Sequence, residues 1–342
     1  LELKMNRCGS TLPVLVLYQS VCCYGLSQVV LRPDGDGSLG FRIARSQVGC
    51  EATLDLHGIG LAVKGPPWIP VVDHFDPEIS LSRTDAEYLA SAGLNVVRLG
   101  AMMPGLMPSA PFNGRYEIDT QYVNKLHTIV EMLAEHGIYT ILEFHQDSLS
   151  EVFCGEGLPQ WVAREILDAF PADFEESVLE LVAALTPRLP GLADLEEGMV
   201  RKFVRQELPK MGFPAPLARP FERAENSSSY FSGQDCSSMT YWKYQLSFQG
   251  GLAARRLFNT SSTTFAHFHK YWQVLATAFK GNTNVLAFEL FNEPFPGGVL
   301  EPWMLIPRNA AQRLTSFYTA LAESIHNIDR HRLVAFSPQT WE

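Results

Sequence analysis

Short apolar runs alternate with longer amphipathic segments along most of the chain after about residue 50. The apolar runs predict strands at residues 54–63, 94–99, 138–144, 284–291 and 332–337. The longer segments carry apolar residues at helical spacing, for example Tyr122, Leu126 and Ile129. They predict helices at residues 81–92, 119–136, 263–280 and 308–328. Alternation of this kind is typical of βαβ units and a parallel sheet.

The predicted strands are nearly continuous apolar runs, which is the pattern of parallel strands buried on both faces. This pattern favours a barrel or a doubly wound sheet. A dinucleotide-binding fold requires Gly-x-Gly-x-x-Gly after its first strand, and the segment that begins at Gly58 lacks the third glycine. We therefore predict no cofactor.

Two further regions flank or interrupt the alternation. Residues 26–53 are predicted to form a strand and hairpin region, because the Asp-Gly-Asp-Gly run at 34–37 is typical of a hairpin turn. Residues 54–342 are predicted to form a partial barrel. Within them, residues 146–262 far exceed the roughly 2–6 residues of an ordinary loop after a strand, so we interpret them as an insertion. Its candidate helices are residues 173–189 and 195–207.

Residues 1–25 are predicted to be a signal peptide. Lys4 and Arg7 precede an apolar stretch that begins at Leu12, and the small residue Gly25 follows it. The alternative is a buried strand, because the run is too short to span a bilayer as a helix.

Glycosylation patterns and cysteines also bear on whether the protein is exported. Asn226-Ser-Ser and Asn259-Thr-Ser match the acceptor pattern for N-linked glycans. Removal of the signal peptide would leave Cys50, Cys154 and Cys236, of which Cys154 and Cys236 could pair within the insertion. We expect a secreted or lysosomal glycoprotein.

The charge balance argues against one class of partner. The chain has 27 basic and 37 acidic side chains, a net charge of −10. Nucleic-acid affinity comes mainly from Lys and Arg that neutralise phosphates. We expect no nucleic-acid partner.

The most informative stretch is Phe-Asn-Glu-Pro-Phe at 291–295, where a buried strand stops at a proline. Pro294 favours an extended conformation at Glu293, which would present that carboxyl group at the carboxyl end of the strand. Surrounding aromatic residues, Phe291, Phe295 and Trp303, are expected to desolvate it and raise its pKa. The alternative is a solvated glutamate at the start of a loop.

The ends of the other strands also carry polar side chains. The first strand leads to Lys64, the second to Arg98, and the third to His145 and Asp147. Several strand ends that direct polar groups to one face indicate a functional site. His145 and Asp147 could ligate a metal, but no third or fourth ligand stands at metal-site spacing, so we predict no metal site.

These residues carry a resemblance to glycoside hydrolase family 5, retaining glycosidases built on a (β/α)8 TIM barrel. Within that family the chain is most similar to the endoglycoceramidases, which release the oligosaccharide from ceramide in glycosphingolipids. The segments that carry the resemblance are residues 56–68, 144–150, 157–161 and 271–297. The combination of His-Gln-Asp-x-x-Ser with Asn-Glu-Pro is more specific than either motif alone.

The resemblance implies a role for each candidate residue. Glu293 would be the general acid/base of a double-displacement reaction, and Asn292 would bind the sugar 2-hydroxyl. Arg98 and His145 would support the nucleophile and the sugar. The residues expected to bind the glucose unit joined to ceramide are Lys64 and Asp147.

The resemblance also implies a nucleophile that the sequence does not supply. The family places this glutamate at the end of the seventh strand, and we see five strands, so we expect a chain truncated after about the fifth strand and inactive alone. Glu342 is wrongly placed, and Glu143 and Glu289 fall inside predicted strands, where we expect structural roles. Gly60 and Ser337 stand where the family usually carries Asn and Glu.

Two alternatives remain open: a β-glucosidase or endoglucanase of the same family, and a catalytically inactive glycan- or glycolipid-binding protein. The expected substrate is a glycosphingolipid or another β-glycoside, with a lipid-presenting activator and peripheral contact with membrane lipid as further candidates. Candidates for a lipid groove are Trp68, Met102, Met103, Leu106 and Met107. For this stripe we favour ordinary packing.

Overall fold

The computed structural model describes residues 26–33, 39–44, 51–170, 198, 202, 242–245, 247–295 and 307–338. Five parallel strands form the main sheet, in the order β4-β5-β6-β7-β8. Their bounds are β4 (Gly58–Leu61), β5 (Val96–Gly100), β6 (Tyr139–Glu143), β7 (Val285–Glu289) and β8 (Leu333–Ala335). All five predicted strands are found, although the first is much shorter than expected.

The strand order distinguishes between the two fold classes that the sequence left open. Each strand pairs with the next strand of this set along the chain, and every pairing is parallel. A doubly wound sheet reverses its order at a switch point, whereas a barrel adds strands in one direction. The described sheet therefore has the topology of a partial TIM barrel.

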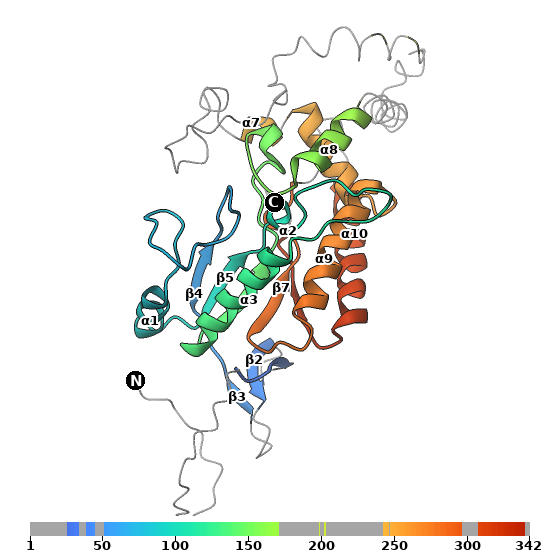
Figure 1. Ribbon diagram of the computed structural model, residues 1–342. Coiled ribbons are helices and arrows are strands. Elements are labelled where there is room, and N and C mark those ends of the chain that lie inside the picture. The colour runs from blue at the N-terminus through green and yellow to red at the C-terminus, as the bar shows by residue number, and fades with distance from the viewer. Residues whose placement is uncertain are drawn as a thin grey trace, which may run out of the picture.

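Four predicted helices connect these strands, and their ends are set by polar caps. The bounds are α1 (Arg83–Ser91), α3 (Thr120–Glu135), α9 (Thr263–Ala278) and α10 (Pro307–Ile328). Ser82 forms a capping box with Asp85 at the start of α1, and Asp119 and Ser262 cap α3 and α9. Figure 1 shows α3, α9 and α10 running alongside the strands.

A small antiparallel sheet lies at the amino end of the parallel strands (Figure 1). Its strands are β1 (Val29–Pro33), β2 (Leu39–Ala44) and β3 (Glu51–Thr53). β1 and β2 pair from Val29↔Ile43 to Pro33↔Leu39, on either side of the predicted hairpin turn, which lies outside the described residues. Val29 packs into a small apolar cluster with residues at the starts of the parallel strands, including Val96 and Tyr139.

The Met-rich segment after β5 packs in the core, which is the alternative that the sequence analysis favoured. It forms the short helix α2 (Met103–Leu106), which the strand and helix pattern did not predict. Met102, Met103, Leu106 and Met107 are all 0% exposed, so the alternative of a lipid track along them is wrong.

The described part of the insertion contains helices of its own, α7 (Trp242–Gln245) and α8 (Phe248–Phe258). They lie beyond the carboxyl ends of the strands, opposite the small sheet (Figure 1). The candidate helices at 173–189 and 195–207 fall almost entirely outside the described residues, as does the predicted signal peptide. No helix in the described ranges combines the length and apolar character needed to cross a bilayer.

Candidate active site

Arg98 joins the carboxyl ends of three neighbouring strands. Its guanidinium donates two hydrogen bonds to the carboxylate of Glu289, Nε to Oε2 at 2.6 Å and one terminal nitrogen to Oε1 at 2.8 Å. The same terminal nitrogen forms an ion pair with Glu143 and donates to Asn292 Oδ1 at 2.9 Å. Paired bonds of this kind fix the orientation of both partners.

The strand register explains why these groups meet. Glu143 and Glu289 are the last residues of β6 and β7, and they occupy paired positions at the carboxyl edge of the sheet. Both glutamates lie in strands, as predicted, at the last position of each, and their carboxylates pair with Arg98. Burial lowers the pKa of Arg98, but the hydrogen bond to Glu289 and the nearby carboxylate charges outweigh it and leave the pKa raised.

His145 and Ser337 extend this network. His145 lies with Nδ1 2.9 Å from Glu143 Oε1. Ser337 Oγ donates to Glu289 Oε1 at 3.1 Å, so the position where the family usually carries Glu still contacts the network.

A second set of hydrogen bonds fixes the backbone that carries Glu293. Gln146 Nε2 donates to the carbonyl oxygens of Asn292 at 2.7 Å and Glu293 at 3.0 Å. In return, Asn292 Nδ2 donates to Gln146 O at 3.0 Å. Asn292 is 6% exposed, so its side chain is locked between Arg98 and Gln146.

Glu293 lies at the predicted place, but two expectations about it are wrong. Its φ is +41°, in the left-handed region, because the bonds from Gln146 override the extended bias that Pro294 imposes. Its side chain is exposed, because Phe291 and Phe295 turn into the core, where Phe291 stacks on Phe144 at 5.2 Å between ring centroids. Trp303 lies outside the described residues.

The carboxylate of Glu293 nevertheless belongs to the same electrostatic site. Its charge is among those that raise the pKa of Arg98. An exposed carboxylate that acts on Arg98, on a backbone held by Gln146, is available to a ligand that approaches the carboxyl end of the sheet.

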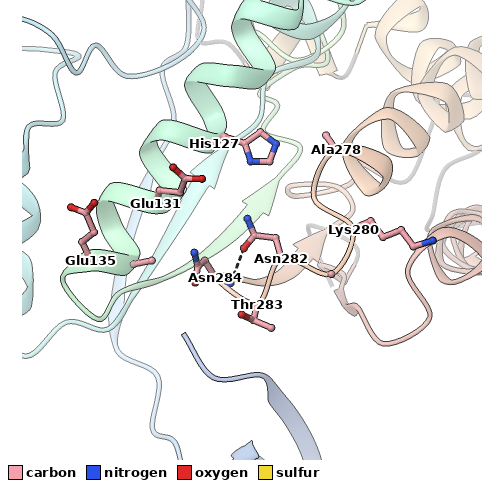
Figure 2. A pocket seen from close by; sticks show the side chains of 10 residues that line it. His127, Glu131, Glu135, Ala278, Lys280, Asn282, Thr283 and Asn284 are labelled. Atoms are coloured by element: carbon pink, nitrogen blue, oxygen red, sulfur yellow. Dashed lines mark hydrogen bonds between the residues drawn. The ribbon is translucent and has the colours of Figure 1, made fainter. Parts of the chain in front are cut away.

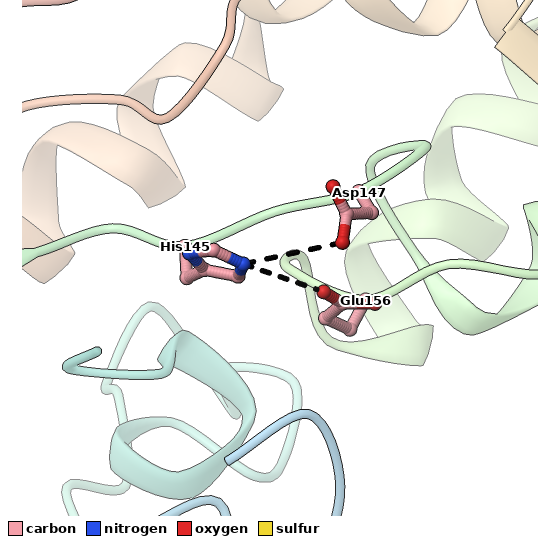
Figure 3. Close-up of side chains that lie close together, drawn as sticks. All are labelled: His145, Asp147 and Glu156. Atoms are coloured by element: carbon pink, nitrogen blue, oxygen red, sulfur yellow. Dashed lines mark ion pairs between the residues drawn. The ribbon is translucent and has the colours of Figure 1, made fainter. Parts of the chain in front are cut away.

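Lys64 and Asp147, the predicted sugar-binding pair, are in direct contact. Lys64 Nζ forms an ion pair with Asp147 and lies 3.2 Å from Glu156 Oε1. Figure 3 shows Asp147 and Glu156 directed at His145, whose Nε2 is 3.9 Å and 3.8 Å from their carboxylate oxygens. The structure thus supplies the third candidate metal ligand that the sequence did not show. The ammonium group of Lys64 already neutralises this cluster, so a metal ion would compete with it.

Sequence reasoning missed Glu143, Glu289 and Glu156 as members of the site. The first two carried a usable signal, because each stands near the end of one of the two predicted strands that follow the strand of Arg98. Glu156 carried a weaker one, a charged residue between two glycines.

A pocket in the described part of the chain lies away from this site. It is a cavity of about 680 Å³ between α3 and the loop that precedes β7, at the amino end of the sheet (Figure 2). Glu131, Glu135 and Lys280 line it, with Asn282 and Thr283. Conserved chemistry in barrels is expected at the opposite end, so we assign this pocket no role in the reaction.

Comparison with known proteins identifies the family of the chain. The family model described as cellulase, glycosyl hydrolase family 5, matches residues 70–177 and 242–342. An endoglycoceramidase of Hydra vulgaris is 29% identical over 288 residues, which are 84% of this chain and 46% of that protein. An endoglycoceramidase of Cyanea nozakii is 28% identical over 84% of this chain and 48% of that protein. The chain therefore spans about half the length of these relatives.

Solved structures show the same fold. Endo-glycoceramidase II from Rhodococcus sp. superposes with a TM-score of 0.52 at 22% identity, covering 90% of this chain and 50% of that protein. A crystal structure of endogalactoceramidase superposes with a TM-score of 0.51 at 19% identity, covering 92% and 54%. One structure of the Rhodococcus protein is a complex with ganglioside GM3.

Proposed function

The chain belongs to glycosyl hydrolase family 5, and from this membership we propose that the protein containing it is a retaining glycosidase that cleaves between the oligosaccharide and ceramide of glycosphingolipids. The observation that carries the proposal is the locked turn at Asn292 and Glu293. It presents a carboxylate at the carboxyl end of a barrel strand, within the electrostatic reach of Arg98.

In this proposal Glu293 is the general acid/base. It protonates the departing ceramide oxygen and later removes a proton from water. Because Glu293 is exposed in the free protein, the bound glycolipid must supply the desolvation that a neutral acid requires. Asn292 is held by Arg98 and Gln146 in one orientation, which suits a donor to the sugar 2-hydroxyl.

A double displacement also needs a nucleophilic carboxylate about 5–5.5 Å from the acid. Glu143 and Glu289 are both committed to Arg98. We therefore place the nucleophile beyond residue 342, on the strand that is seventh in the family. Arg98 and His145 would orient it.

The test is product analysis with the full-length protein, the gene product that contains this chain. With lactosylceramide the expected products are intact lactose and ceramide. Glu293→Gln should lose activity by about 10²–10⁴-fold, the usual contribution of acid/base catalysis. Glu87→Gln, an exposed change on α1, is the matched control and should leave the rate unchanged.

Other products would identify a different protein. Release of glucose from simple β-glucosides without cleavage of lactosylceramide would favour the β-glucosidase or endoglucanase alternative. This alternative gains from the burial of the Met-rich stripe, which removes one candidate lipid groove. Binding without any cleavage by the full-length protein would favour an inactive glycan-binding protein. Turnover by the 342-residue chain alone would contradict our placement of the nucleophile.

Export and lipid contact are further parts of the proposal. Cys154 is disulfide-bonded, which suits an oxidising compartment, and Asn259 of the second glycosylation pattern is exposed; Cys236 and Asn226 lie outside the described residues. We propose a secreted or lysosomal glycoprotein. Glycosidase treatment should shift its mass, and Asn259→Gln should reduce that shift.

For lipid contact we propose the loops after β4 and β5, which carry the exposed side chains of Phe75 and Phe112, 83% and 79% exposed. A lipid-presenting activator would meet the same face. Replacing both residues with Ser should lower activity on vesicle-borne glycolipid and leave activity on a soluble aryl glycoside unchanged.

A further inference from the structure

Glu156 is a fully buried carboxyl group that touches the predicted sugar-binding pair. Its side chain is 0% exposed, whereas the side chains of Lys64 and Asp147 are 34% and 24% exposed. The charged and titratable groups that face it are Lys64, Asp147 and His145. Glu156 is therefore the buried member of this cluster, and Lys64 and Asp147 are its partly exposed members.

The local backbone holds Glu156 in this place. Asp147 and Glu156 form an isolated bridge, with Asp147 N donating to Glu156 O at 3.1 Å and Glu156 N donating to Asp147 O at 2.8 Å. Gly155 allows the close approach, because a Cβ at that position would lie 1.6 Å from Asp147 O. The disulfide at Cys154 ties down the residue before it. A loop built this closely around one carboxyl group indicates a defined task for it.

The protonation state follows from the surroundings. Burial and the charge of Asp147 raise the pKa of Glu156 to about 9, although Lys64 acts in the opposite direction. At neutral pH the group is an uncharged acid that can donate a hydrogen bond to Asp147. Lys64 then has one ionised partner, Asp147. Its ammonium group can still donate a hydrogen bond to a ligand.

We propose that Glu156 is a positioning residue, which acts on the sugar through Lys64 and Asp147 and does not touch it. This inference rests on the proposed function, since it assigns Lys64 and Asp147 to the glycone. Without the buried acid, the pair of Lys64 and Asp147 loses its support on the buried side and no longer presents fixed donors and acceptors to the sugar hydroxyls.

The experiment compares two variants of the full-length protein on a soluble aryl β-lactoside. Glu156→Met fills the volume without a hydrogen bond, and we expect KM to rise about tenfold while kcat changes by less than about threefold. Glu156→Gln keeps a neutral donor, and its KM should stay within about threefold of wild type because its amide can donate to Asp147.

A double-mutant cycle separates positioning from general stability. In an Asp147→Asn background, Glu156→Met should add less than about twofold to KM, since both changes act through the same contact. Additive effects would overturn the proposal, as would a lowered melting temperature with an unchanged KM.

Calorimetric titration with lactose keeps the two proposals apart. A wild type that binds lactose but does not cleave the lactoside contradicts the proposed function, and the lactose affinities of the variants then test Glu156 in place of KM. A wild type that neither binds nor cleaves overturns both. Cleavage by wild type with equal KM in all variants overturns the role of Glu156 alone.

Discussion

One face of the parallel sheet carries opposite chemistry at its two ends. At the amino end this face is apolar: Val96 and Tyr139 pack against Val29 of the small sheet. Two and four residues further along the same strands, at the carboxyl end, the face carries Arg98 and Glu143. The same strands form both ends, so membership of a buried strand does not by itself explain the change from apolar to charged residues. The charged groups at the carboxyl end pair with one another, whereas the apolar residues at the amino end pack against the small sheet.

The two ends of the sheet also differ in the partners of their buried or half-buried arginines. Arg98 at the carboxyl end binds side-chain carboxylates and the amide of Asn292. Arg332 at the amino end, just before β8, is 7% exposed and donates mainly to main-chain carbonyl oxygens, those of Phe279 at 2.8 Å, Asn282 at 3.0 Å and Val285. Burial lowers the pKa of Arg332, and Asp329 opposes this. An arginine that binds backbone fixes a loop, whereas one that gathers carboxylates sets the charge of a site.

Replacing Arg98 should have the largest effect. Arg98→Met leaves the carboxylates of Glu143 and Glu289 without their cation, and an uncompensated buried charge costs about 3–5 kcal/mol. The full-length variant should lose more than about a hundredfold in kcat/KM, because the same change removes the hydrogen bond from Arg98 that helps to orient Asn292. Steady-state kinetics on the folded fraction checks this. Loss of stability with normal kcat/KM would show that both ends of the sheet are merely structural.

Replacing Arg332 should affect stability alone. Arg332→Met leaves several carbonyl groups at the amino end without a donor, and we expect about 2–3 kcal/mol less free energy of unfolding. Urea denaturation measures this change. The kcat/KM of the folded variant should match wild type, and a large fall in it would erase the distinction between the two ends.

The dependence of stability on pH should reveal the raised pKa of Glu156, the buried acid at the carboxyl end. The pKa of Glu156 is raised from 4.5 to about 9, so the folded protein keeps a proton that the unfolded chain has lost between these values. Wild type therefore loses stability as pH rises from about 4.5 to about 9. Glu156→Gln lacks this term, so its melting temperature should gain a few degrees relative to wild type across that window. Parallel pH profiles of the two proteins would contradict the raised pKa.

The smallest effect is expected on the surface near the amino end. Arg83 forms an exposed ion pair with Glu135. Glu135→Gln should change the free energy of unfolding by less than about 1 kcal/mol, because exposed pairs are weak and screened by salt. Thermal denaturation at low and high salt checks this, and a cost comparable to that of Arg332→Met would refute it.

The sequence predicted the strands and helices well, because the hydrophobic pattern that marks each of them is set by residues close together in the chain. The apolar runs that became β5, β6 and β7 and the helical spacing in α3 depend on neighbours within a few residues. The short helix α2 was missed because its apolar residues are too few to show a period.

The site was predicted less completely because it depends on register and on loops. The positions of Arg98, His145 and Asn292 followed from strand ends, but the pairing of Glu143 with Glu289 needs the register between β6 and β7. Glu156 reaches the site only through a loop that returns to Asp147. At Glu293 the local preference imposed by proline was overridden by distant hydrogen bonds from Gln146, and the aromatic residues expected around it turned into the core.

The most direct test of the central claim is the dependence of the Glu293→Gln defect on the leaving group. An acid matters only when the departing oxygen needs a proton, so kcat/KM should fall by at least about 10²-fold on lactosylceramide. On an aryl lactoside with a strongly acidic phenol as leaving group, kcat/KM should fall by less than about tenfold. Equal losses on both substrates would contradict a proton-donating role for Glu293.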